Sequence, residues 1–378
     1  YEKALSIRSF HLGEDSLLVA ETRKDLGSLH FDKADFDKAR HYLGEAMQTM
    51  TAQSPNDLAT ADASFLLGKV MSKMKYRDEA VRHFENALQI RRRQQLSDAE
   101  DLGVADILFE LGVANEEYKN YDQSVYFYEQ ALAIRKSILD EEDEVLADIY
   151  HNIGVIQQSK EKYQNALNSF GSALVIYQTC LGDDHLSCAK TMNNIGIVYE
   201  SMNDYSESMK YHQEALRVRT LHLSNNHLKV ANSLDNIASV YQKQKQNNLA
   251  LECLKEALKI RITRLGKDHL EVATTLFGMG IIFCDLEELD KAMDSYNASL
   301  KIRMRKIGNS GIEIAQSLHN MGGVFALKEE YKEALGRWQE SLEKYREVGL
   351  MDDHHMVKCT LRNIEMATKY IQDSKVNV

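Results

Sequence analysis

A repeat of about 42 residues runs through the chain and limits its possible folds more than any other feature. The motif Ala-Leu-x-Ile-Arg, or a close variant of it, recurs at spacings of 42, 41 and 44 residues and then steadily at 42. An apolar residue followed by glycine recurs with the same period. Such periods indicate stacked supersecondary units and not a single globular core. The motif begins at Ala4, Ala46, Ala87, Ala131, Ala173, Ala215, Ala257, Ser299 and Ser341.

Each repeat carries the pattern of two amphipathic helices. In the repeat at 187–222, apolar residues follow at steps of four and three from Cys188 to Met202, which places them on one helical face. A second helix begins near Tyr205, and its small, large and small residues let a facing helix approach closely. One proline in 378 residues also favours helix. We predict an all-α fold, a right-handed α-solenoid (superhelix) of antiparallel helix pairs.

The repeat markers divide the chain into one array over residues 1–378. Residues 1–10 match the second helix of a repeat, so we expect the chain to be a fragment. Residues 356–371 match a first helix, which would cap the array. Full repeats are predicted at 17–51, 57–94, 101–138, 145–180, 187–222, 229–264, 271–306 and 313–347.

The connections between repeats have a recurring composition, as in 181–185 (LGDDH) and 265–269 (LGKDH). The glycine is expected to supply a left-handed turn after one helix, and the aspartate a side-chain oxygen that caps the next. The histidines recur once per repeat, so they lie too far apart to share a metal ion. We expect polar packing at the start of the first helix from His185, His227 and His269.

The recurring small, glycine and aromatic positions of the helix pairs resemble tetratricopeptide repeats of the 42-residue kinesin light chain type, and so does the segment 265–273 (LGKDHLEVA). The resemblance covers essentially the whole chain. It implies a helical solenoid whose first helices line a groove, and a role in binding cargo peptides. One departure is that Leu186, Leu228 and Leu270 stand where that family usually has proline.

In that family the residue two before the glycine points into the groove, which makes it a candidate peptide-binding position. An asparagine there offers a donor and an acceptor to the backbone of an extended peptide. This chain has Asn152, Asn194, Asn236 and Asn320 in these positions, with Asn363 in the terminal half repeat. The preceding residues differ in charge and are expected to supply selectivity: His151, Asn193, Asp235, His319 and Arg362.

Two interpretations of these asparagines remain open. They either bind a peptide, or bond neighbouring helices and fix the register of the repeats. The series breaks at Phe277-Gly278, and earlier repeats carry Phe65-Leu66 and Phe109-Glu110, so a more apolar stretch of groove is expected there.

The sequence contains none of the common catalytic, nucleotide-binding or metal-binding motifs. It contains no phosphate-binding glycine loop, no nucleophile elbow and no zinc-protease motif. His212 and Trp338 occupy the bulky core slot, and Cys188 is expected to be a small apolar filler. We therefore expect no catalytic residue, no metal and no cofactor.

Composition and charge restrict the expected classes of partner and the expected cellular compartment. The net charge of −11 disfavours nucleic acid, and no apolar run is long enough to insert into a membrane. Five cysteines without a paired spacing indicate reduced thiols and a cytoplasmic location.

Acidity is concentrated in residues 97–149, with a balance of −12, beside a basic stretch at 73–93. The acidic residues include Asp98, Glu100, Asp101 and the run 140–144. Solvated helix ends and loops would explain both patches, and a docking surface for a structural subunit is the alternative.

We predict a non-enzymatic scaffold or adaptor that binds a short peptide segment of a partner protein in its groove. The alternative is a sensing or autoinhibitory repeat arm of a larger enzyme, such as a STAND-type ATPase with its catalytic domain outside this chain. The sequence identifies neither the partner nor the oligomeric state.

Overall fold

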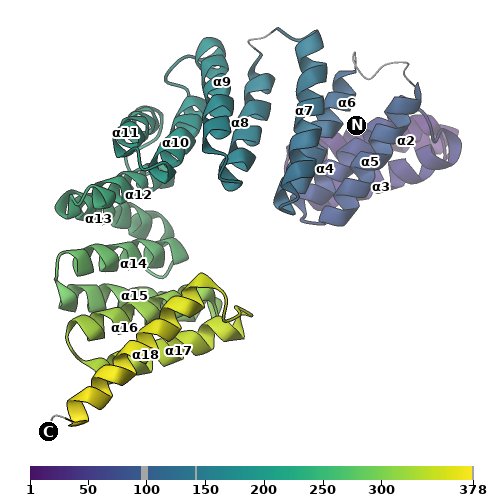
Figure 1. Cartoon of the computed structure of the whole chain (residues 1–378). Coiled ribbons are helices and arrows are strands. Elements are labelled where there is room, and N and C mark those ends of the chain that lie inside the picture. The colour runs from purple at the N-terminus through teal and green to yellow at the C-terminus, as the bar shows by residue number, and fades with distance from the viewer. Residues whose placement is uncertain (95–100, 141–142, 377–378) are drawn as a thin grey trace. The chain divides into compact units, whose positions relative to one another are not determined.

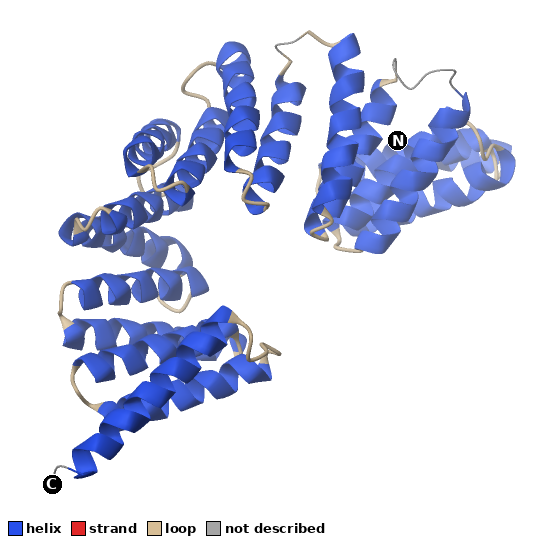
Figure 2. Ribbon diagram, in the orientation of Figure 1, coloured by secondary structure: helices blue, strands red, loops and turns tan. Residues whose placement is uncertain are grey.

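The computed structural model describes residues 1–94, 101–140 and 143–376, with the backbone alone at 374–376. The described residues form eighteen α-helices and contain no strand (Figures 1 and 2). The helices fall into two compact parts, a first half (Tyr1–Asp183) and a second half (Asp184–Val378).

Within each half, helices that follow one another in the chain pack side by side as antiparallel pairs (Figure 1). The first half comprises α1 (Glu2–Leu12), α2 (Leu17–Asp32), α3 (Phe36–Gln53), α4 (Leu58–Lys73), α5 (Arg77–Gln94), α6 (Leu102–Glu117), α7 (Tyr121–Ile138), α8 (Glu144–Ser159) and α9 (Tyr163–Leu181). The second half comprises α10 (Leu186–Ser201), α11 (Tyr205–His222), α12 (Leu228–Lys243), α13 (Asn247–Leu265), α14 (Leu270–Asp285), α15 (Leu289–Ile307), α16 (Ile312–Leu327), α17 (Tyr331–Glu347) and α18 (His355–Val376). The predicted all-α fold of stacked helix pairs is confirmed, whereas the division into eight full repeats stays a prediction.

The close approach of the two helices in a pair explains the regular spacing of glycine and a bulky residue along the chain. A Cβ atom on Gly68 would lie 2.7 Å from the ring of Phe84, and one on Gly322 would lie 2.6 Å from Trp338 Nε1. A side chain in place of either glycine would therefore push the two helices of its pair apart or displace the ring. The predicted core positions are confirmed, because Trp338 is 1% exposed and His212 and Cys188 are 0% exposed.

The turn between the two helices of a pair contains one residue with positive φ that is not glycine. In the α10–α11 turn this residue is Asn203, with φ of +62°. The equivalent residues are Ala34, Lys75, Lys119, Glu161, Lys245, Glu287 and Glu329.

The connections between pairs correct one detail predicted from the sequence. Gly182 and Gly266 take φ of +86° and +84°, which favours glycine as predicted. In these connections of the second half, however, the cap of the next helix is histidine, whereas aspartate caps α4, α6 and α8 as predicted, at Asp57, Asp101 and Asp143. His185 Nδ1 accepts a hydrogen bond from the Ser187 amide at 3.2 Å, and the same bond forms at His227, His269 and His354. This confirms that these histidines pack at helix starts.

The charged patches of the first half partly neutralise one another. Arg91 Nη1 lies 3.0 Å from both carboxylate oxygens of Asp101, and Arg135 pairs with Asp106. Asp98, Glu100 and residues 141–142 lie outside the described residues. No helix in the described ranges is both long enough and apolar enough to cross a bilayer.

Candidate functional site

The last residue of the repeat motif joins one helix pair to the next, a role that sequence reasoning missed. Arg303 is 5% exposed, and its Nη1 donates to the Glu313 carbonyl oxygen at 2.7 Å and to Ser317 Oγ at 2.8 Å on the next first helix. Arg219 and Arg261 bond residues 14 positions further along in the same way. The regular recurrence of an arginine on an apolar face was the signal that could have identified this role.

Two of the residues predicted to supply selectivity face the motif arginine of their own repeat. Asn193 Oδ1 accepts from Arg219 Nη1 at 3.2 Å, and Asp235 Oδ2 lies 2.5 Å from Arg261 Nη1. The ring of Phe277 lies under the Arg303 guanidinium, 4.7 Å from ring centroid to Cζ. These side chains are therefore partly committed to the packing of the repeats.

His151 requires a correction. Its ring is 1% exposed and lies 5.3 Å from the Phe170 ring, centroid to centroid. A side chain buried in this way cannot select a ligand in the groove. His151 and Asn152 also belong to the first half, whereas the other predicted site residues belong to the second.

The asparagines bond neighbouring repeats and keep part of their surface exposed. Asn236 Nδ2 donates to Asn193 Oδ1 at 2.8 Å, across from α12 to α10. Burial raises the pKa of the Tyr128 and Tyr296 hydroxyls, and Asn152 and Asn320, each on the first helix of the following repeat, partly oppose this rise. Asn194 is half-buried. The register interpretation thus has direct contacts in its favour, while the exposed parts remain accessible to a ligand.

The first half carries aromatic residues on its first helices, and they pack inward. The ring centroids of Phe65 and Phe109 lie 5.8 and 5.5 Å from those of Phe84 and Tyr128. Burial raises the pKa of Glu110, which occupies the asparagine slot there.

In the second half, three hollows lie along the faces of the first helices. The small hollow, of about 200 Å³, lies between α12 and α14 over Leu254. Asp235, Ser239, Gln242, Thr275 and Gly278 are among the residues that line it. Gly278 stands in the asparagine slot, so this hollow is where the missing side chain would lie.

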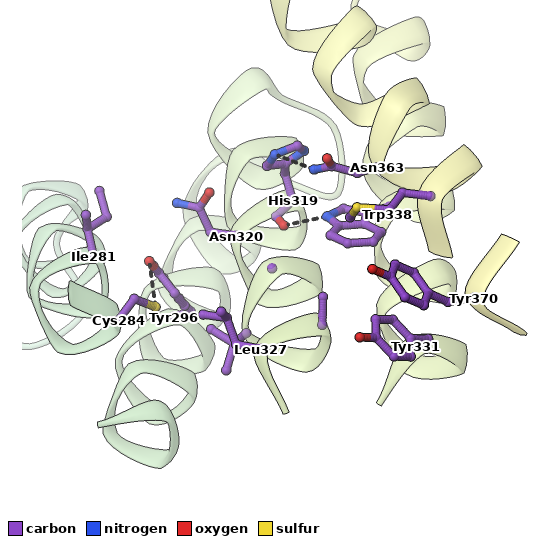
Figure 3. A pocket seen from close by; sticks show the side chains of 14 residues that line it. Ile281, Cys284, Tyr296, His319, Asn320, Leu327, Tyr331, Trp338, Asn363 and Tyr370 are labelled. Atoms are coloured by element: carbon purple, nitrogen blue, oxygen red, sulfur yellow. Dashed lines mark hydrogen bonds between the residues drawn. The ribbon is translucent and has the colours of Figure 1, made fainter. Parts of the chain in front are cut away.

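The large hollow, of about 690 Å³, lies between α14, α16 and α18 (Figure 3). Tyr296 and Trp338 form part of its wall, with Tyr331 and Tyr370 stacked 4.7 Å apart at one side. Gly323 also lines it, and a Cβ atom there would meet nothing within 4 Å. The same slot holds Ile197 and Ile281 in other repeats, so a second glycine opens this hollow.

Three of the residues named from the sequence, His319, Asn320 and Asn363, line the large hollow, and none of its lining residues is Asp, Glu, Lys or Arg. His319 Nδ1 lies 2.9 Å from Thr360 Oγ1. Its Nε2 lies 3.5 Å from Asn363 Nδ2, and its carbonyl oxygen accepts from Trp338 Nε1 (Figure 3). Burial lowers the pKa of His319, so its ring is neutral at physiological pH. The hollow is suited to a bulky neutral side chain flanked by amide hydrogen bonds.

The three hollows adjoin one another. Ile281 lines both the small and the large hollow, and His319 and Asn320 line both the large hollow and a third one of about 300 Å³ beside Phe277 and Met356. Apolar surface stays exposed at the rim, since Leu327 is 62% exposed and Tyr370 is 52% exposed. The described part of the chain holds no cluster of side chains that could bind a metal ion.

Comparison with known proteins agrees with the resemblance seen in the sequence. The sequence model of the tetratricopeptide repeat family matches residues 59–137, 145–220 and 229–305. No curated protein sequence matches.

Solved structures that resemble this chain share its fold at low sequence identity. The quorum sensor NprR from B. thuringiensis is 14% identical at a TM-score of 0.70, and the alignment covers 86% of this chain and 87% of that one. A STAND protein with a tetratricopeptide repeat sensor from Pyrococcus horikoshii is 15% identical at a TM-score of 0.64, over 86% of this chain and 47% of that one. BtubC (BKLC) from P. vanneervenii is 21% identical at a TM-score of 0.53, over 61% of this chain and 92% of that one.

Proposed function

Because the chain belongs to the tetratricopeptide repeat family, we propose that it is a non-enzymatic scaffold that binds an extended segment of a partner protein along the three hollows of its second half. The observation that carries this proposal is the pair of glycines, Gly278 and Gly323, in slots that hold side chains in other repeats. Packing does not require a glycine at either position, since an added Cβ would make one ordinary contact at Gly278 and none at Gly323. Each of the two glycines lines one of the hollows, so the lack of a side chain there leaves space that a ligand can enter.

In this proposal the large hollow takes one bulky apolar side chain of the partner. Exposed apolar surface at Leu327 and Tyr370 would be covered by the same segment. Asn194, Asn236 and Asn320 would bond its backbone with the exposed parts of their amides, while Asp235 and His319 would contact its side chains. A cytoplasmic protein or peptide is the ligand class that this arrangement fits.

The proposal is tested by filling the large hollow. A phage-displayed library of dodecapeptides is selected on the intact chain, and binding of the selected peptides is measured by fluorescence polarisation. We expect Gly323→Ile to raise Kd at least tenfold, because the new side chain occupies the space that the ligand uses. Replacing glycine by isoleucine inside a helix adds about 0.5 kcal/mol of helix propensity, so the melting temperature should not fall.

Gly336→Ile is the matched control. Gly336 lies in α17, and a Cβ there also meets nothing within 4 Å, but this residue is exposed and lines none of the three hollows. Peptides whose affinity is unchanged by Gly323→Ile, or that respond equally to both substitutions, would show that the large hollow is not the binding site.

A sensing arm of a STAND-type ATPase is the second candidate, and the fold shared with the Pyrococcus horikoshii protein favours it. The coding sequence upstream of residue 1 distinguishes the two. A phosphate-binding loop there would support the sensing arm, and heptad repeats would support an adaptor.

A further inference from the structure

The small hollow differs from the large one in charge. Asp235 forms part of its wall, and burial raises the pKa of this carboxyl group. Its Oδ2 atom pairs with Arg261, whereas its Oδ1 atom is buried and accepts no hydrogen bond from any described residue. The carboxylate is therefore short of hydrogen-bond donors, while 28% of the side-chain surface of Asp235 stays exposed.

Arg261 does not neutralise the surroundings of the hollow by itself. Its Nε atom also lies 3.2 Å from Glu271 Oε2, so one guanidinium serves two carboxylates. Its remaining donors bond Thr275 Oγ1 at 2.5 Å and Asn232 Oδ1 at 2.7 Å. The group of three charged residues therefore keeps a net negative charge.

Two polar donors on the wall are already used by further carboxylates, and the hydroxyls of Thr274 and Thr275 donate to backbone carbonyl oxygens of their own helix. Ser239 Oγ donates to Glu200 Oε1 at 2.6 Å, and Gln242 Nε2 donates to Asp285 Oδ2 at 2.8 Å. The hollow thus has an excess of acceptors and of negative charge over an apolar floor formed by Leu254. A ligand group suited to it has an apolar stem and a cationic donor at its tip.

We propose that the small hollow binds a lysine or arginine side chain of the partner segment, about three residues away from the bulky apolar residue in the large hollow. This inference rests on the proposed function and names the class of segment that it would bind. The spacing follows because α14 borders both hollows, neighbouring helices pack about 8–10 Å apart, and an extended chain advances about 3.3 Å per residue. The volume of about 200 Å³ is several times the ~30 Å³ of a water molecule, which leaves room for the stem.

The selected dodecapeptides test this preference directly. We expect them to be enriched in a basic residue about three positions from a large apolar one. Replacing that basic residue by glutamine in the peptide should raise Kd about tenfold on the native chain. Added salt should weaken the basic peptide more than the glutamine peptide, because only the basic peptide loses an ionic contact.

Gly278→Asn restores the side chain found in the other repeats and fills the hollow. A Cβ at this position meets only Leu254 Cδ1, at an ordinary distance of 3.7 Å, so the fold should be retained. On this variant the basic and glutamine peptides should bind equally. Asp235→Asn keeps the shape of the wall and should reduce the same discrimination. Gly336→Asn in α17 is the matched control and should leave it intact.

The outcomes separate this inference from the proposed function. Peptides that depend on Gly323 but bind equally well with lysine, glutamine or glutamate would overturn the basic preference and leave the scaffold proposal standing. Discrimination that survives Gly278→Asn would also overturn it. A library that yields no peptide dependent on Gly323 would overturn both.

Discussion

His212 occupies a slot that holds phenylalanine, tyrosine or tryptophan in most other repeats, and it lacks the partners that a histidine needs. It is 0% exposed, and neither ring nitrogen forms a hydrogen bond with any described residue. Burial, with a smaller contribution from Arg219, lowers its pKa from 6.5 to about 4. The ring is therefore neutral in the folded chain, and its two unpaired nitrogens destabilise the core.

This burial makes stability depend on pH. Between pH 6.5 and about 4 the unfolded chain binds a proton on His212 that the folded chain does not, so stability decreases as the pH falls through that window. The full effect is at most about 3 kcal/mol. We expect His212→Phe to remove this component and to raise the free energy of unfolding at pH 7.5 by about 1–2 kcal/mol.

Urea denaturation at pH 7.5, 6 and 5 measures the effect of His212→Phe. His41→Phe is the control, because the His41 side chain is 64% exposed. An unchanged pH dependence in the His212 variant would contradict the prediction.

Single residues show which structural details could be predicted from the sequence and which could not. The burial of His212 and Trp338 followed from their slot, since periodic spacing defines which face a residue occupies. The residue that caps α10 could not be predicted from the sequence, because Asp184 and His185 both offer a hydrogen-bond acceptor. Only the backbone geometry decides which of them meets the Ser187 amide. His151 was placed on the groove by its slot, but it packs against Phe170.

At the scale of the helix pair, the motif arginine is the main polar connection between one repeat and the next. Tyrosine takes its place in two repeats, and the Tyr177 hydroxyl bonds Asp148 at 2.5 Å. Tyr345, in the equivalent position of α17, is 2% exposed. The slot therefore accepts a large side chain with an apolar stem, which has a polar tip in arginine and tyrosine but not in Met50 of α3.

Arg303 provides the test at this scale. Arg303→Ala removes the donors to Glu313 and Ser317 and the packing over Phe277, so we expect a loss of about 2–4 kcal/mol in the free energy of unfolding. Arg303→Tyr should lose less, because tyrosine fills this slot elsewhere. Urea denaturation of both variants measures the difference, and equal losses would contradict the interpretation of the slot.

The hollows illustrate why the candidate site was only partly predicted. The break in the asparagine series at Gly278 was visible in the sequence, but its consequence was expected to be an apolar groove. The acidic character depends on tertiary packing, because Asp235 and Glu271 meet only at Arg261, and Asp285 reaches Gln242 only when α12 and α14 pack. The glycine at 323 carried a signal as well, since its slot holds isoleucine in two other repeats.

At the scale of the whole chain, the periodic sequence predicts a stack in which each helix contacts few others. Within each half, close contacts join consecutive helices and, less extensively, the first helices of adjacent pairs. Stability in such a stack is a sum of terms from each repeat and from each interface between neighbours. A local change should therefore have a local effect, unlike a change in a single cooperative core.

Hydrogen exchange measured by mass spectrometry tests this expectation. Arg303 lies in α15 and its donors reach α16, so Arg303→Ala should increase amide exchange in α14 to α17. Exchange in α4 and α5, which belong to the other half, should remain as in the native chain. Lys301→Ala, an exposed change on the same helix, is the control and should alter neither region. A uniform increase along the chain would instead show that all repeats open together, because every amide would then exchange through one global unfolding step.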